Sequence, residues 1–142
     1  MKKLVIICIL MLSLVSCSSD NVKSSSSVET EYYGKWTLVK ITGNFVTNTT
    51  SNMAWKETYI FNTDGTFSKT KTENNTTITA VGTFKITTPP NETLFELNYK
   101  ESSSIVESCN GHQTENLHLN KDNTLASDWQ NCDGWGLIFK KE

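Results

Sequence analysis

The stretch "ETYIFNTDGTFSKTK", residues 57–71, reads as two short strands around a turn at Asn62–Gly65. Asp64 and Gly65 supply the positive φ angles that tight hairpin turns require. Tyr59 and Phe61 share one face of the first strand, and Phe67 continues that face on the second strand. The stretch therefore predicts a β-hairpin that buries one face.

The same period of two recurs along the rest of the chain. Threonine is the most frequent residue, aromatic residues are common, and no long stretch has helical spacing. Strands are predicted at "GKWTLVKI" (34–41), at "TITAVGTFKIT" (77–87, with a bend at Gly82), around Phe95–Tyr99, near Ile105–Val106, on both sides of "NKDN" (120–123), and at Trp135–Phe139. The pattern predicts an all-β fold, a small eight-stranded antiparallel up-and-down barrel.

The barrel interior is predicted to hold many aromatic rings, and the glutamates are expected mostly at outward strand positions. The rings expected inside are Trp36, Tyr59, Phe61, Phe67, Phe84, Phe95, Tyr99, Trp129, Trp135 and Phe139. An eight-stranded barrel is just wide enough either to be filled by side chains or to hold one small ligand. Both states are compatible with this sequence.

Residues 1–16 have the pattern of a secretory signal peptide. Lys2 and Lys3 precede an apolar run at 4–12, which is too short to span a membrane as a helix, because a spanning helix needs about 20 apolar residues. The sequence Leu14–Cys17 resembles the lipobox of bacterial lipoproteins, in which the cysteine is acylated through its sulfur. The resemblance implies that Cys17 is the site of lipid attachment.

Residues 17–31 are predicted to be a flexible Ser-rich tether, because they contain almost nothing apolar. The folded domain then covers 32–142, the size of one small domain. Each buried methylene contributes about 0.8 kcal/mol, so two or more acyl chains would hold the protein on a lipid bilayer. We expect a monomeric, membrane-anchored protein of the cell envelope, at the outer membrane on its periplasmic or external side.

The charge of the chain argues against nucleic acid as a partner. Without Lys2 and Lys3, 11 of the 13 basic residues remain against 15 acidic ones, which gives a net charge of −4. The chain also contains no arginine, so the bidentate guanidinium fork that grips phosphate, carboxylate or guanine is missing.

The opening of the first strand carries a family resemblance. Gly34 and Trp36 form the Gly-x-Trp motif at the start of the first strand of lipocalins, and "FNTDGTF" and "DGWGLIF" add to the likeness, so the body is similar to bacterial lipocalin-like lipoproteins. In that family a late arginine packs on the tryptophan. Here Lys140 or Lys141 would have to take its place.

The resemblance implies a binding protein for a small apolar ligand at the cell envelope. The long connection "TGNFVTNTTSNMAW" (42–55) lies where the mouth of such a barrel would be controlled. Phe45, Met53, Trp55 and Tyr59 are the candidate ligand contacts, although the same large side chains would also plug the barrel end. The alternative function is a structural or protein-interaction lipoprotein whose barrel is filled by side chains.

Two cysteines remain in the folded body, Cys109 and Cys132, and an oxidising compartment favours a disulfide between them. Both histidines of the chain, His112 and His118, lie between these cysteines, so a Cys₂His₂ zinc set is the alternative. His118 stands between two leucines and is expected to face outward. The irregular spacing favours the disulfide, and no metal site is predicted.

Signatures of enzymes are absent from the sequence. There is no Gly-x-Ser-x-Gly elbow, no phosphate-binding glycine loop and no His-Glu-x-x-His helix. We therefore predict neither catalysis nor a cofactor.

Overall fold

The structure is a computed structural model and describes residues 31–43, 46–49, 53–88, 90, 92–109, 111 and 113–142. Cys17, Phe45 and His112 lie outside the described residues, as do the predicted signal peptide and the tether up to residue 30. The described residues form nine strands and one short 3₁₀ helix: β1 Gly34–Gly43, β2 Val46–Thr49, β3 Trp55–Phe61, β4 Thr66–Glu73, β5 Thr76–Thr87, β6 Thr93–Tyr99, β7 Thr114–Leu119, β8 Thr124–Ser127, η1 Trp129–Cys132 and β9 Gly136–Lys141. No helix in this part of the chain is long and apolar enough to cross a membrane.

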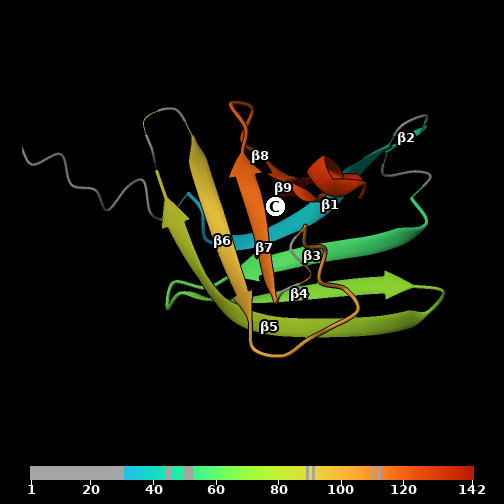
Figure 1. The fold of residues 1–142 in the computed structure, drawn as a ribbon, viewed down its shortest axis with the longest axis horizontal. Coiled ribbons are helices and arrows are strands. Elements are labelled where there is room, and N and C mark those ends of the chain that lie inside the picture. The colour runs from blue at the N-terminus through green and yellow to red at the C-terminus, as the bar shows by residue number, and fades with distance from the viewer. Residues whose placement is uncertain are drawn as a thin grey trace, which may run out of the picture.

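Eight of the strands close into an antiparallel barrel (Figure 1). The order is β1–β3–β4–β5–β6–β7–β8–β9, and β9 returns to β1, where Leu38 lies opposite Phe139. Each barrel strand pairs with its neighbour along the chain once β2 is set aside, so the connectivity is up-and-down. The predicted eight-stranded up-and-down barrel is confirmed. The strand expected at Ile105–Val106 is wrong, because the barrel closes without it.

β2 is an additional strand that pairs with the second half of β1. Lys40–Gly43 pairs with Val46–Thr49, whereas the first half of β1, Gly34–Thr37, pairs with Thr58–Phe61 of β3. Part of the long connection that was predicted between the first two strands is therefore a hairpin.

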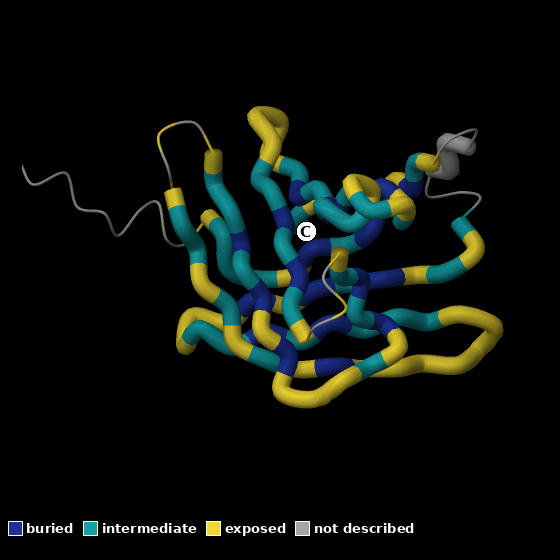
Figure 2. Tube along the Cα trace, in the orientation of Figure 1, coloured by how far each residue is buried: buried dark blue, intermediate teal, exposed yellow. Residues whose placement is uncertain are grey.

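The barrel interior contains most of the predicted rings. Tyr59 and Phe61 are stacked with their centroids 5.7 Å apart, and both are buried with Phe67. Figure 2 shows that the buried positions gather at the centre of the barrel, whereas the tip of the β4–β5 hairpin is exposed. The prediction for Trp135 is wrong, because this side chain is 41% exposed. The chain leaves η1 through a left-handed residue, Asp133, and enters β9 only at Gly136, so the alternation of β9 does not extend back to Trp135.

Two hairpins of the barrel use the same turn. Residues 62–66, Asn-Thr-Asp-Gly-Thr, and residues 120–124, Asn-Lys-Asp-Asn-Thr, share the pattern Asn-x-Asp-(Gly/Asn)-Thr. In each turn the threonine backbone N–H and hydroxyl donate to the aspartate Oδ1, and the asparagine Nδ2 donates to the threonine hydroxyl. The fourth position has φ of +81° in the first turn (Gly65) and +58° in the second (Asn123), whereas the positive φ predicted at Asp64 is wrong. Glycine or asparagine is therefore favoured at the fourth position.

The up-and-down connectivity gives the barrel two different ends. The terminal end holds the β3–β4, β5–β6 and β7–β8 turns and both ends of the folded domain. The plug end holds the short β4–β5 turn and the connections from β1 to β3, from β6 to β7 and from β8 to β9, which are longer. Loops at one end of a rigid scaffold are where binding residues usually lie. A binding site is therefore expected at the plug end.

Candidate functional site

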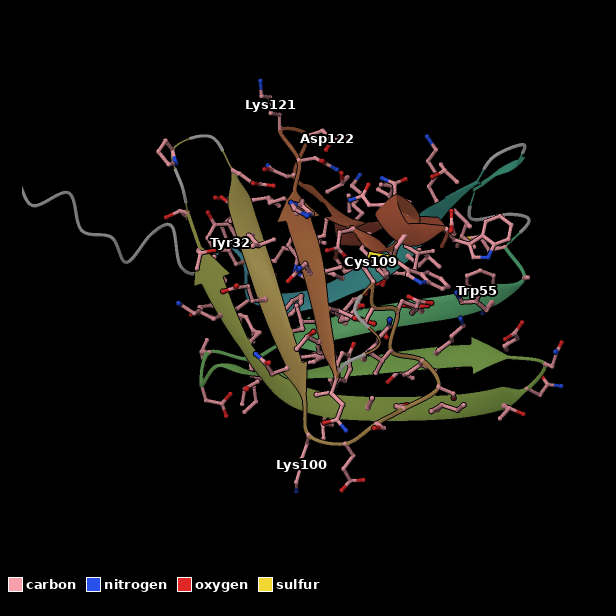
Figure 3. The ribbon with its side chains drawn as sticks, viewed as in Figure 1. Tyr32, Trp55, Lys100, Cys109, Lys121 and Asp122 are labelled. Carbon is pink, nitrogen blue, oxygen red and sulfur yellow. A yellow bond between two sulfur atoms is a disulfide. The ribbon has the colours of Figure 1, made fainter. Side chains whose placement is uncertain are left out.

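The plug end is covered by the segment Lys100–Cys109, here called the plug segment. It forms neither helix nor strand, and it places Ile105 and Glu107 in the barrel, where their exposed fractions are 3% and 5%. A disulfide joins Cys109 to Cys132 at the end of η1, with the Cα atoms 5.4 Å apart. Figure 3 shows Cys109 beside η1, with the sulfur in yellow. The segment is thus tied to the connection between β8 and β9.

The ammonium group of Lys69 lies at the centre of the plug end, among three carboxylates. Its Nζ is 3.0 Å from Glu57 Oε1, 2.9 Å from Glu107 Oε2 and 2.9 Å from Glu115 Oε1. The side chains of Lys69 and Glu57 are 0% exposed, and those of Glu107 and Glu115 are 5% and 2% exposed. We call these four residues the Lys69 cluster.

Neutral and charged donors surround the cluster. The hydroxyls of Tyr59 and Tyr99 donate to Glu115 Oε2 at 2.7 and 2.6 Å. The backbone N–H of Glu107 also donates to Glu115, and Lys71 Nζ lies 3.3 Å from Glu107 Oε1. Glu115 therefore accepts from four donors.

Glu57 is less well supplied with donors than the other two carboxylates. The indole N–H of Trp55 donates to its Oε2 at 3.0 Å, and the ammonium of Lys71 lies 4.3 Å from the centroid of that indole ring. Glu57 Oε1 lies 3.0 Å from the Lys69 ammonium, and no other donor reaches it among the described residues.

Strand alternation explains why these charges lie inside. Glu57 shares the inward face of β3 with Tyr59, and Lys69 shares the inward face of β4 with Phe67. Tyr59 is paired with Lys69 across the two strands, and Glu57 with Lys71. Glutamates were expected at outward positions, but Glu57, Glu107 and Glu115 are buried, so that expectation is wrong for these three. The parity of β3, β4 and β7 was the signal in the sequence that would have found two of them.

Burial and neighbouring charges shift the pKa values of the cluster. Burial raises the pKa of Glu57 from 4.5 to about 7; the Lys69 ammonium lowers it in part, and the Glu107 carboxylate raises it further. Burial alone lowers the pKa of Lys69, but Glu115 and Glu57 outweigh that effect and hold its pKa well above the usual value. Burial, reinforced by Glu115, also raises the pKa of Tyr59 well above its ordinary value. Lys69 is therefore a cation throughout the physiological range, whereas Glu57 exchanges a proton near neutral pH.

The rest of the barrel interior is filled by apolar side chains. Solvent-accessible surface is present wherever a water molecule fits against a side chain, both on the outside of the protein and in an enclosed cavity. A side chain with almost no accessible surface is therefore in contact with protein atoms on all sides. The interior residues with exposed fractions of 0–2% are Trp36, Leu38, Ile41, Tyr59, Phe61, Phe67, Phe95, Leu97, Leu117, Leu125, Leu137 and Phe139. Over these positions the barrel is packed solid.

The candidate ligand contacts predicted from the sequence differ in their burial and in their place in the barrel. Tyr59 is part of the core and hydrogen-bonds Glu115. Met53 and Trp55 are half-buried against the core at the plug end, which fits their alternative role as plugs. Phe45 lies outside the described residues.

The cysteines and histidines do not form a metal site in the described residues. Cys109 and Cys132 lie at bonding distance as a disulfide, as expected, so neither sulfur is a thiolate ligand. His118 faces outward, as predicted, and its Nδ1 contacts Glu92. No group of three or more His, Cys, Asp or Glu among the described residues is arranged to hold a metal ion. The central position among the three buried carboxylates belongs to the Lys69 ammonium.

The Gly34–Trp36 motif lies at the terminal end. Trp36 is 2% exposed, and its indole N–H donates to the Tyr32 carbonyl oxygen at 3.0 Å. Lys141 is the residue paired with Trp36 on β9, and it is one of the two lysines, Lys140 and Lys141, that the sequence offered in place of an arginine. A hollow of about 350 Å³ at this end is lined by Glu31, Tyr32, Trp36, Leu119, Asp122, Asn123, Lys140 and Lys141.

Comparisons of the chain with models of known protein families, with curated proteins and with solved structures find no match. The lipocalin-like resemblance therefore stays a prediction from the sequence.

Proposed function

We propose that this protein is a lipocalin-like lipoprotein, anchored through acylated Cys17, whose filled barrel is a rigid protein-interaction domain at the cell envelope. The observation that carries this proposal is the near-zero exposure of the interior side chains, from Trp36 on β1 to Phe139 on β9. A small apolar ligand would have to displace packed aromatic rings, and each such ring buries about 150–250 Å². A protein that binds to the outer surface of the barrel displaces none of these rings.

One hollow on the outer wall supports an interaction surface. A groove of about 520 Å³ crosses β4, β5 and β6, and its lining includes Val81, Gly82 and Lys100. Val81 is 50% exposed, and Ile60, two strands away through Ser68, is 42% exposed. Val81 lines the groove, whereas Ile60 lies beside its lining residue Ser68. Exposed apolar side chains at and beside a groove with a polar rim are typical of protein interfaces.

Ligand titration tests the filled barrel. We expect no saturable quenching of tryptophan fluorescence, and no rise in melting temperature, with a panel of fatty acids, retinoids and haem-like compounds. Saturable quenching by one compound, together with thermal stabilisation, would restore the small-ligand function.

A photo-crosslinking residue tests the surface in living cells. We expect a discrete protein adduct when it replaces Val81 in the groove. Ile78 is the matched control, because it is apolar, on the same strand and 39% exposed, but it does not line the groove. Equal adducts at both positions, or none at Val81, would contradict the proposed surface.

The anchor is tested separately by labelling with radioactive palmitate. Cys17→Ala should abolish both the label and membrane sedimentation, whereas Cys8→Ala, within the predicted signal peptide, should change neither. Label retained by the Cys17 variant would disprove attachment at that residue.

A further inference from the structure

The charges at the plug end do not balance. Three carboxylates, Glu57, Glu107 and Glu115, meet two ammonium groups, Lys69 and Lys71, so the fully ionised group carries a net charge of −1. Lys71 is the most exposed of the five, with 19% of its side chain exposed, and the others are 5% exposed or less. An uncompensated buried charge is costly, and one bound proton removes it.

The hydrogen bonds select the carboxylate that takes this proton. Glu115 accepts from Lys69, both tyrosine hydroxyls and a backbone N–H, and Glu107 lies against both ammonium groups. Glu57 accepts the indole N–H of Trp55 and lies 3.0 Å from the Lys69 ammonium, but no tyrosine hydroxyl and no backbone N–H donates to it among the described residues. Hydrogen bonds to a carboxylate favour its charged form. Glu57 is therefore the member that is protonated first.

The element best able to respond to this charge is the plug segment. Glu57 is fixed in β3, between β1 and β4, whereas Glu107 is in a segment without strand pairing. The plug segment is held on the barrel by Ile105, by the ion pairs of Glu107 with Lys69 and Lys71, and by the disulfide at Cys109. Backbone N–H groups of the segment also donate to Glu115 and to the Val81 carbonyl. Two ionised carboxylates on the same ammonium repel each other. Loss of the proton from Glu57 therefore weakens the hold of Lys69 on Glu107.

We infer that the Lys69 cluster is a proton-binding site, and that a proton on Glu57 fastens the plug segment to the barrel. Lys69 and Lys71 from β4, Glu107 from the plug segment and Trp55 from β3 act on Glu57 directly. Glu115 from β7 acts through Lys69, and it accepts from Tyr59 of β3 and Tyr99 of β6. Together they make opening of the plug segment dependent on pH.

The direction of this dependence follows from linkage. The closed state holds the Glu57 proton up to a pKa of about 7, and an open, solvated carboxyl releases it at its ordinary value of 4.5. Opening is therefore rare at acidic pH, increases as the pH rises between these two values, and levels off above the higher one. For one proton this corresponds to roughly a tenfold increase in opening between pH 6 and pH 8.

Amide hydrogen exchange with mass spectrometry measures this opening in the disulfide-bonded protein. Protection factors, corrected for the intrinsic exchange rate at each pH, should fall roughly tenfold between pH 6 and pH 8 in peptides that cover the plug segment. The core strand β6, Thr93–Tyr99, should change much less.

Two variants test whether the pH dependence of exchange in the plug segment comes from the Glu57 proton or from another group. Glu57→Gln keeps an acceptor for the Trp55 indole but has no proton to lose, so protection of the plug segment should be high and independent of pH. Glu101→Gln removes an exposed carboxylate of the same segment and should leave the pH dependence intact. The inference is overturned if the plug segment of the unmodified protein shows no pH dependence, if Glu57→Gln retains it, or if β6 loses protection to the same extent. The first and third outcomes need no variant, so they hold even if Glu57→Gln does not fold.

Discussion

Replacement of Lys69 by methionine should strongly destabilise the barrel. Methionine fills a similar volume but leaves three buried carboxylates that now lie within 2.9–3.0 Å of an ammonium group. The charge of the buried group, counted with Lys71, would go from −1 to −2 when all carboxylates are ionised. Removing one partner of a buried ion pair costs about 3–5 kcal/mol, so we expect a loss of this size in the free energy of unfolding at pH 8. The loss should shrink at pH 5, because the orphaned carboxylates can take up protons.

Urea denaturation, followed by tryptophan fluorescence at both pH values, checks this expectation. Lys56→Met is the matched control, because Lys56 is an exposed lysine on the neighbouring strand β3. The double variant Lys69→Met with Glu57→Gln should be more stable than Lys69→Met alone, because one of the unpaired charges is gone. A loss below about 1 kcal/mol, or a loss equal to that of the control, would show that the cluster does not hold the barrel together.

Three further changes test other parts of the fold. Replacing both Cys109 and Cys132 by serine should lower the free energy of unfolding by about 3 kcal/mol, since the bridge closes a loop with a separation of 23 residues; reduction of the unmodified protein should give the same loss in urea. Gly82→Ala should cost about 1–3 kcal/mol, because a Cβ there would lie 2.1 Å from a backbone oxygen of β6; an unchanged melting temperature would contradict this contact. Asp64→Ala and Asp122→Ala should lower the melting temperature by similar amounts, because both turns have the same hydrogen bonds, and unequal effects would show that the turns are not equivalent.

The hairpins were predictable because their signals are local. Tyr59, Phe61 and Phe67 alternate around a turn whose residues favour positive φ, and Leu117, Leu119 and Leu125 do the same around the second turn. Alternation of apolar and polar residues over one short strand predicts which face of that strand is buried, and the prediction does not need the identity of the partner strand. Enough hairpins of this kind indicate a meander that closes into a barrel.

The Lys69 cluster was not predictable in the same way. Lys69 and Glu57 have the parity of buried residues, but a charged residue is normally assigned to the solvent, because burial without a partner is costly. The partners that make burial possible come from positions 38 and 46 residues further along the chain, Glu107 and Glu115. Glu107 has no strand pattern at all, since it lies in the irregular plug segment. Only the tertiary path of the chain brings these charges together.

The folded domain starts and finishes on the same side of the barrel, where the backbone N–H of Glu142 donates to the carbonyl of Lys35 at 3.0 Å. A short glycine-rich linker would therefore suffice to join these ends, and a circularly permuted chain could be opened at the exposed Asn74–Asn75 turn instead. A cargo fused after Glu142 would sit on the same side as the predicted tether. The plug end, which holds the disulfide and the buried Lys69, would stay uncovered by such a fusion.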